Sequence, residues 1–185
     1  MRFRDIPKFV HGGNYAVDVS WSYLEEWLQA QIDDGTGLDL DPDFQRGHVW
    51  DDKKRAAYVE YILRGGMSSK SLWWNCKGWN HGRRDTPLTI VDGKQRMEAV
   101  RMFLRNELCI FASLDKRKRG FVYTEFTDKL GIIDAAFRMH VNNLETRELV
   151  LQWYLDLNEG GVVHTEEELT RVRRLLEQEK KRGGK

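Results

Sequence analysis

The 185-residue sequence predicts an α+β domain, on the strength of two patterns and its composition. Runs rich in β-branched and aromatic residues predict strands at residues 14–19, 72–76 and 87–91. Apolar residues recur with a helical period in the segments 21–32, 51–63, 94–104, 146–157 and 165–176. Hydrophobic residues make up 41% of the chain, with 7 Trp, 8 Phe and 6 Tyr, which is enough for a packed core without disulfide bonds.

The first half of the chain has clear signals for where helices begin and end. Ser20 or Ser22 can cap the first helix, and Ser22 has capping-box spacing to Glu25. We expect its inward stripe to be Trp21, Leu24, Leu28 and Ile32. Residues 38–50 show no strong period and predict a loop with a short extended piece. Asp51 is expected to cap the next helix, which ends before the glycines at 65–66.

The second half is predicted to hold three more strands and two helices. We expect strands at 108–113 and 120–126, joined by the basic turn 115–119, and another at 138–144. The helix at 146–157 should bury Leu149, Val150, Trp153 and Leu157. The final helix should bury Leu169, Val172, Leu175 and Leu176. The chain then divides into a single domain, 1–176, and a basic, frayed tail, 177–185.

The charge balance argues against a protein that binds nucleic acid over its whole surface. Lys and Arg total 30 and Asp and Glu total 29, so any anion site must be local. Two cysteines without CxxC spacing predict neither a disulfide framework nor a zinc site. The N-terminus does not resemble a signal peptide, and no long apolar run predicts a membrane span. A cytoplasmic location is therefore the expectation.

The predicted strand–turn–helix junction at residues 90–96, IVDGKQR, is the main candidate site. The N-terminus of a helix presents unpaired N–H groups, and its dipole favours an anion. Gly93 permits a tight turn and close approach of a ligand, while Lys94 and Arg96 add positive charge. Asp92 can bind a metal ion, orient a water molecule or bind a ribose hydroxyl. It can equally be no more than the N-cap of the helix.

Two further segments carry candidate polar residues, each with a plain structural alternative. Gln45 and Arg46 can clamp a second phosphate or contact a base, or they can be exposed neighbours of the core residues Phe44 and Trp50. Asn158 and His164 flank a glycine pair at 160–161 that is typical of a helix end. No histidine-based metal motif, Walker A loop, GxGxxG fingerprint or GxSxG elbow occurs.

These segments together resemble the ParB/sulfiredoxin superfamily. The shared features are Phe44-Gln45-Arg46, then Trp50, then the sequence VDGKQR at 91–96. The DGKQR sequence is similar to the DGQQR motif of the N-terminal domain of GmrSD-type, modification-dependent restriction enzymes, with Lys94 in place of the first Gln. The segment 154–161, YLDLNEGG, with Thr165 and residues 166–169, resembles the same branch. The likeness runs from about Val17 to Leu176.

The resemblance implies a ParB/sulfiredoxin-like core, with a small mixed sheet, flanking helices and a C-terminal helical pair. In that branch the motif is linked to nucleotide binding and hydrolysis that control a separate HNH nuclease domain. By analogy, Asp92 and Arg96 are the expected catalytic residues, and no metal ligand is assigned. The expected nucleotide- and phosphate-binding residues are Gln45, Arg46, Gly93, Lys94, Gln95, Asn158 and His164. Too few residues follow Leu176 for an HNH domain, so we expect a stand-alone copy.

Three functions follow from the sequence. The first is a nucleotide-binding domain or NTP hydrolase, with an NTP as ligand, with or without Mg²⁺. The second is a ParB-like module that binds or cleaves DNA, for which the basic clusters 83–84 and 116–119 and the tryptophans Trp73, Trp74 and Trp79 are candidate contacts. The third is a non-catalytic regulatory subunit of a restriction or defence system, with a separate nuclease or another effector as its partner.

Overall fold

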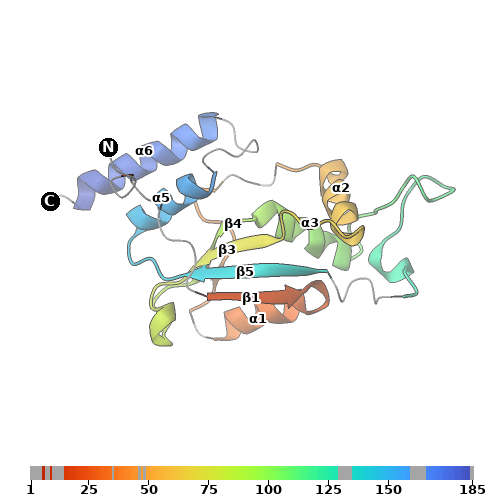
Figure 1. Ribbon diagram of the computed structural model, residues 1–185, viewed down its shortest axis with the longest axis horizontal. Helices are drawn as coiled ribbons and strands as arrows, with labels where there is room; N and C mark the ends of the chain where they lie inside the picture. Colours follow the sequence, from red (N-terminus) through yellow and green to blue (C-terminus); the bar gives the residue numbers. More distant parts are fainter. Residues whose placement is uncertain are drawn as a thin grey trace.

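The computed structural model describes residues 6, 9, 15–34, 36–45, 47, 49–128, 135–158 and 166–183. It shows a mixed α+β fold (Figure 1), as the sequence predicts. The five strands are β1 (Tyr15–Ser20), β2 (Leu38–Asp39), β3 (Ser71–Asn75), β4 (Leu88–Asp92) and β5 (Ala136–Asn142). The α-helices are α1 (Leu24–Asp33), α2 (Asp52–Leu63), α3 (Lys94–Leu104), α5 (Arg147–Asn158) and α6 (Glu166–Gly183). Short 3₁₀ turns are η2 (Trp21–Tyr23), η3 (Trp79–His81) and η4 (Tyr123–Glu125).

The strands form one open, mixed sheet in the order β1-β5-β3-β4-β2. β5 runs antiparallel to β1 and parallel to β3, while β4 runs antiparallel to β3 and parallel to β2. The register between β3 and β4 shifts between Trp73 and Trp74, close to the end of β4. The candidate site therefore begins where the regular pairing of β3 and β4 ends.

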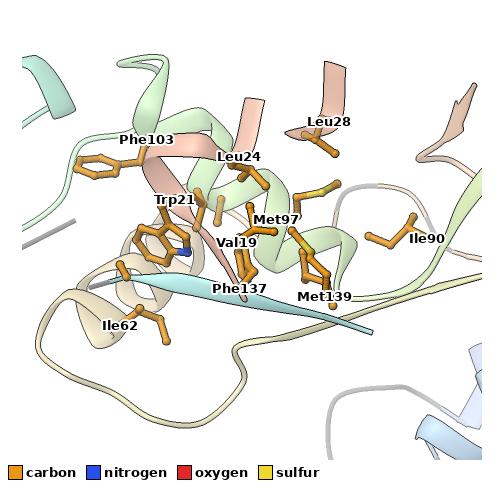
Figure 2. Close-up of a cluster of buried hydrophobic side chains, with 14 of the residues drawn as sticks. Val19, Trp21, Leu24, Leu28, Ile62, Ile90, Met97, Phe103, Phe137 and Met139 are labelled. Carbon is orange, nitrogen blue, oxygen red and sulfur yellow. The ribbon is translucent and has the colours of Figure 1, made fainter. Parts of the chain in front are cut away.

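Helices cover both faces of the sheet. On one face, side chains from α1, α2 and α3 pack against alternate strand residues, and Figure 2 shows this cluster with Trp21, Met97 and Phe137 at its centre. On the other face, α5 and α6 pack against Val91 and Phe44. The alternation of Ile90 and Val91 between these clusters follows from the two-residue period of a strand. α5 and α6 pack together, which confirms the predicted C-terminal helical pair.

Several expectations about single elements were wrong. Tyr23, not Ser22, precedes α1, and no side chain caps that helix. Leu24 and Leu28 are buried as predicted, but Ile32 and Leu149 are exposed, and Gln31 and Leu151 face inward in their helices instead. Residues 177–183, which we expected to fray, continue α6 to Gly183. Asp51, in contrast, caps α2 as predicted, accepting a hydrogen bond from the Lys54 N–H at 2.8 Å.

The prediction of two strands at 108–113 and 120–126 is also wrong. The structure has only one isolated antiparallel bridge there, between Ile110 and Phe121, followed by η4. Backbone at positive φ interrupts this segment at Phe111 and Lys118, which is incompatible with an extended strand. Among the described residues, no helix is both long and apolar enough to cross a lipid bilayer.

Candidate functional site

Gly93 forms the junction between β4 and α3. Its φ of 101° lies in the left-handed region, and it occupies the N-cap position of α3 without any side-chain cap. A Cβ at this position would lie 2.3 Å from the Cδ2 of Leu72, a fully buried side chain of β3 that would have to move. The interpretation of Asp92 as the N-cap is therefore wrong. The backbone N–H groups at the start of α3 remain without a side-chain acceptor.

Asp92 instead binds Arg96, one turn along α3. Arg96 Nη2 donates to Asp92 Oδ2 at 2.6 Å and to the Ser71 carbonyl oxygen at 3.0 Å. Only about a fifth of each charged side chain is exposed, 21% for Arg96 and 23% for Asp92. Arg96 Nε is buried and has no hydrogen-bond partner among the described residues. The guanidinium is thus held in place through Nη2, while its buried Nε has no partner.

Tyr58 of α2 lies close to this ion pair. Its hydroxyl donates to the Ser69 carbonyl oxygen at 2.9 Å. Burial raises the pKa of Tyr58, and the positive charge of Arg96 offsets only part of that rise. The phenol therefore stays neutral at physiological pH and contributes packing beside Arg96.

Lys94 does not point toward solvent, although it is charged. Its side chain is only 6% exposed, and its ammonium group forms an ion pair with Asp41, whose side chain is 81% exposed. Asp41 belongs to the segment after β2, which we call the 41–50 loop; Arg46 and His48 within it lie outside the described residues. A buried ammonium requires such a partner, because an unpaired buried charge is strongly disfavoured. Lys94 thus fixes the start of the 41–50 loop.

Two glutamine side chains hold the rest of this loop. Gln45 Nε2 donates to the Ile90 carbonyl oxygen of β4 at 2.7 Å. Gln95 Oε1 accepts the N–H groups of Val49 and Trp50 at 3.2 and 3.3 Å, while its Nε2 donates to the Gly47 carbonyl oxygen at 3.0 Å. The motif residues Lys94 and Gln95 therefore attach the 41–50 loop to the start of α3.

The other predicted site residues are placed differently. Asn158 is buried at the end of α5 and donates to the Tyr154 carbonyl oxygen of its own helix at 2.6 Å. Tyr154 in turn packs edge-on against Phe44, with ring centroids 5.5 Å apart. Arg46 and His164 lie outside the described residues. The structure thus brings Gln45 together with residues 92–96 and gives Asn158 a contact within its own helix.

A cleft of about 470 Å³ opens beside Asp41, between the 41–50 loop and the start of α5. Its described lining carries four carboxylates, from Asp39, Asp41, Asp43 and Glu145, and two cations, Lys77 and Arg147. This excess of negative charge disfavours a polyphosphate. The sequence analysis did not identify Asp41, Tyr58 or Ser71 as site residues. Only Asp41 had a signal that could have found it, because it lies in an acidic stretch, DLDPD at residues 39–43.

The tryptophans that the sequence suggested for base stacking make contacts within the protein. Trp74 is fully buried, and Trp73 stacks on His140 with ring centroids 4.0 Å apart. Arg84 lies over the Trp79 ring at 5.1 Å and donates to the Gln31 carbonyl oxygen at 3.1 Å. Trp73 and Trp74 are therefore occupied by contacts within the protein, as is Arg84, whereas the side chain of Arg83 is exposed.

Comparison with known proteins gives one result. No curated protein and no solved structure matches the chain significantly. The family model described as the GmrSD restriction endonuclease, N-terminal domain, matches residues 24–177. This range includes the whole junction at 92–96 and the four strands β2 to β5, but not β1. This connects the chain with restriction systems. The chain therefore belongs to the family of the N-terminal domain of GmrSD restriction endonucleases.

Proposed function

We propose that this chain is a nucleotide-binding domain that takes the phosphates of an NTP at the start of α3. The observation that supports this most is the uncapped helix N-terminus beside Arg96. The N–H groups of Lys94, Gln95 and Arg96 precede the first backbone hydrogen bond of the helix, from Met97 N to Gly93 O at 3.0 Å. Such N–H groups, with the helix dipole, favour a phosphate.

Arg96 would supply the principal charge for this phosphate. Its Nη2 is used by Asp92 and Ser71, and its other nitrogens make no hydrogen bond within the described part of the chain. A guanidinium can bind a phosphate through two parallel N–H groups. Gly93 permits the left-handed turn that places these N–H groups beside Arg96.

Hydrolysis would extend this role through Asp92. When a phosphate engages Arg96, the Asp92 carboxylate becomes available to orient the attacking water, and Arg96 stabilises the charge that develops on the phosphoryl oxygens. One carboxylate also suits Mg²⁺, which keeps several waters and takes its other ligands from phosphates. In the described part of the chain, no cluster of three or more His, Cys, Asp or Glu could hold a metal ion without such phosphates.

Titration of the chain with each of the four NTPs, with and without Mg²⁺, tests binding. A nucleotide at about 100 times its Kd should raise the free energy of unfolding by about 2.7 kcal/mol, which a thermal-shift measurement detects. Arg96→Ala should remove this stabilisation. Arg101→Ala is the matched control, because Arg101 lies on the same helix and is similarly buried in an ion pair, with Glu25 at 2.8 Å.

Both variants should lower the melting temperature without nucleotide, since each breaks an ion pair. Only Arg96→Ala should lose the nucleotide-dependent rise. If no nucleotide stabilises the wild-type chain, or if both variants respond to nucleotide alike, the proposed site is wrong.

A second function, a non-hydrolytic regulatory subunit, is favoured by a different observation. The side chains of Lys94 and Gln95 are bound to the 41–50 loop rather than directed at a ligand. In that role nucleotide binding at α3 would be reported through the 41–50 loop to a separate nuclease or other effector. Phosphate release measured with the isolated chain distinguishes the two: binding without turnover supports regulation, and turnover supports an NTP hydrolase.

A further inference from the structure

The segment between α3 and η4 carries a second charged surface, far from the junction at 92–96. It extends from the end of the molecule opposite to α6, at the right of Figure 1. At its tip lie a leucine, one acid and four consecutive cations, LDKRKR, at residues 114–119. We call these six residues the basic loop. Leu114 is 69% exposed, and Lys116, Arg117, Lys118 and Arg119 are exposed as well.

The only acid of the basic loop is turned inward. The Asp115 carboxylate accepts the backbone N–H groups of Arg117, Arg119 and Gly120 at 3.0, 3.2 and 3.1 Å. Only 11% of its side chain is exposed. Three N–H donors hold this carboxylate inside the turn, and Arg119 Nε lies 4.0 Å from its Oδ2, so Asp115 does not face outward as the other charged side chains of the basic loop do.

The cations of the basic loop differ in what they contact. Arg119 binds Glu125 at the root, with Nη1 to Oε2 at 3.1 Å, and this contact, helped by the charge of Arg117, lowers the pKa of Glu125. The side chains of Lys116, Arg117 and Lys118 form no hydrogen bond or ion pair within the described part of the chain. Three adjacent positive charges therefore point outward from one narrow turn.

The root of the basic loop is fixed, so the cations are presented on a rigid support. Ile110 and Phe121 exchange backbone hydrogen bonds at 3.0 and 2.8 Å. Gly120 lies so close to Ile110 that a Cβ would meet its carbonyl oxygen at 2.7 Å. Below this bridge, Phe121 and Phe103 pack edge-on against Phe126. Arg64, directly after α2, lies over the ring of Phe111 and adds a further positive charge near the root of the basic loop.

We propose that the basic loop binds the phosphate backbone of duplex DNA. Phosphates occur every few ångströms along a duplex, so a turn with adjacent cations can contact several of them together. A single turn is narrow enough to enter the major groove, which is about 12 Å wide, and an exposed leucine suits apolar contact with sugars or thymine methyl groups. This proposal does not depend on nucleotide binding at α3.

An acidic protein is the competing partner, and the shape of the surface argues against it. The basic loop projects as a point and offers one exposed apolar side chain, whereas a stable protein interface needs a broad patch with a buried apolar core.

Fluorescence anisotropy of the full chain with a labelled duplex of about 20 base pairs tests the proposal across a range of salt concentrations. The test variant is Lys116→Gln/Arg117→Gln/Lys118→Gln. The matched control is Lys180→Gln/Lys181→Gln/Arg182→Gln, which removes the same charge from three consecutive residues of α6. Circular dichroism and the melting temperature check that both variants fold, and Arg117→Lys, which keeps the charge, should bind like the wild type.

If each of three cations contacts one phosphate, the slope of log K against log salt should be less steep by about 2.7 in the test variant, and the α6 variant should keep the wild-type slope. For the wild type these contacts alone correspond to a loss of about 20-fold in affinity between about 50 and about 150 mM salt. Equal losses in both variants would show non-specific charge attraction and overturn the proposal, as would wild-type binding by the test variant. Tighter binding to poly-glutamate than to duplex would assign the basic loop to an acidic protein instead.

Discussion

At the scale of single residues, Gly93 makes the junction possible. Its φ of 101° is unfavourable for any residue with a side chain, and a Cβ there would clash with the buried side chain of Leu72. Gly93→Ala should therefore lower the free energy of unfolding by about 2 to 4 kcal/mol, combining left-handed strain with overpacking. Chemical denaturation monitored by circular dichroism measures this loss.

Gly37→Ala provides the control for Gly93→Ala. Gly37 has a φ of 85°, but a Cβ there would meet no atom within 4 Å. The free energy of unfolding of this variant should fall only by the cost of the left-handed backbone conformation, about 1 kcal/mol. Equal losses for the two variants would mean that contact with Leu72 contributes nothing at Gly93.

Single residues also show which features of the site could be predicted from the sequence and which could not. The turn at Gly93 and the start of α3 at Lys94 were predictable, because strand, glycine and helix signals are local. The partners of the motif side chains were not. Gln95 contacts backbone groups 45 to 48 residues away, and Lys94 pairs with a residue 53 positions earlier. Such contacts depend on how the 41–50 loop folds back, for which no periodic signal exists.

At the scale of elements, α3 connects the candidate site with α1. Glu25 of α1 accepts hydrogen bonds from Arg101 at 2.8 and 3.2 Å and from Arg105 at 3.1 and 3.2 Å. Burial raises the pKa of Glu25, but these two arginines outweigh that effect, so the pKa is lowered overall. The ion-pair cluster therefore anchors the far half of α3 to the helix that follows β1.

The lowered pKa of Glu25 predicts a pH-dependent contribution to stability. A carboxyl group with a lower pKa in the folded state stabilises the fold above its unfolded pKa, about 4.3 for Glu, and this contribution is lost as the pH falls through the folded value. Glu25→Gln should therefore be less stable than the wild type near neutral pH, by at most about 1 kcal/mol because solvent screens the half-exposed pair. Urea denaturation at several pH values should show this difference vanish in acid.

The exposed neighbour Glu26 supplies the control for Glu25→Gln. Glu26→Gln removes the same charge, and Glu26 forms no ion pair in the described part of the chain. Its stability should follow the wild type at every pH. A difference between Glu25→Gln and wild type that persists undiminished in acid would show that the carboxylate charge is not the cause.

Element boundaries were predictable where capping and periodicity agree, and failed where they conflict. α2 and α3 start within one residue of the predicted positions, because Asp51 and Gly93 mark them. The segment 108–126 reads as two strands from its apolar residues, yet it forms a loop. Its residues pack individually against Phe103 and Glu60: Phe111 N donates to Glu60 Oε1 at 2.6 Å, and Tyr123 packs edge-on against Phe103. Side-chain contacts replaced the strand pairing that the pattern favours.

At the scale of the whole molecule, the sheet separates two apolar clusters that share the same strands. Adjacent residues of β3 and β4 serve opposite clusters, with Trp74 and Ile90 on one face and Trp73 and Val91 on the other. If the helices on one face of the sheet unfolded, the apolar side chains of β3 and β4 on that face would be exposed, although the same strands support the cluster on the other face. The layers formed by α1–α3 and by α5–α6 are therefore expected to unfold together.

A pair of matched cavity variants tests this cooperativity. Val100 of α3 and Val172 of α6 are both buried, one in each cluster. Val100→Ala and Val172→Ala each remove the packing of two buried methyl groups and should each lower the free energy of unfolding by about 2 to 3 kcal/mol. Denaturant unfolding should give one transition for both variants, coincident when followed by tryptophan fluorescence and by circular dichroism. If Val172→Ala instead produces an early, separate transition while Val100→Ala shifts only the later one, then α5 and α6 form an independently unfolding layer, and residues 1–176 do not behave as a single domain.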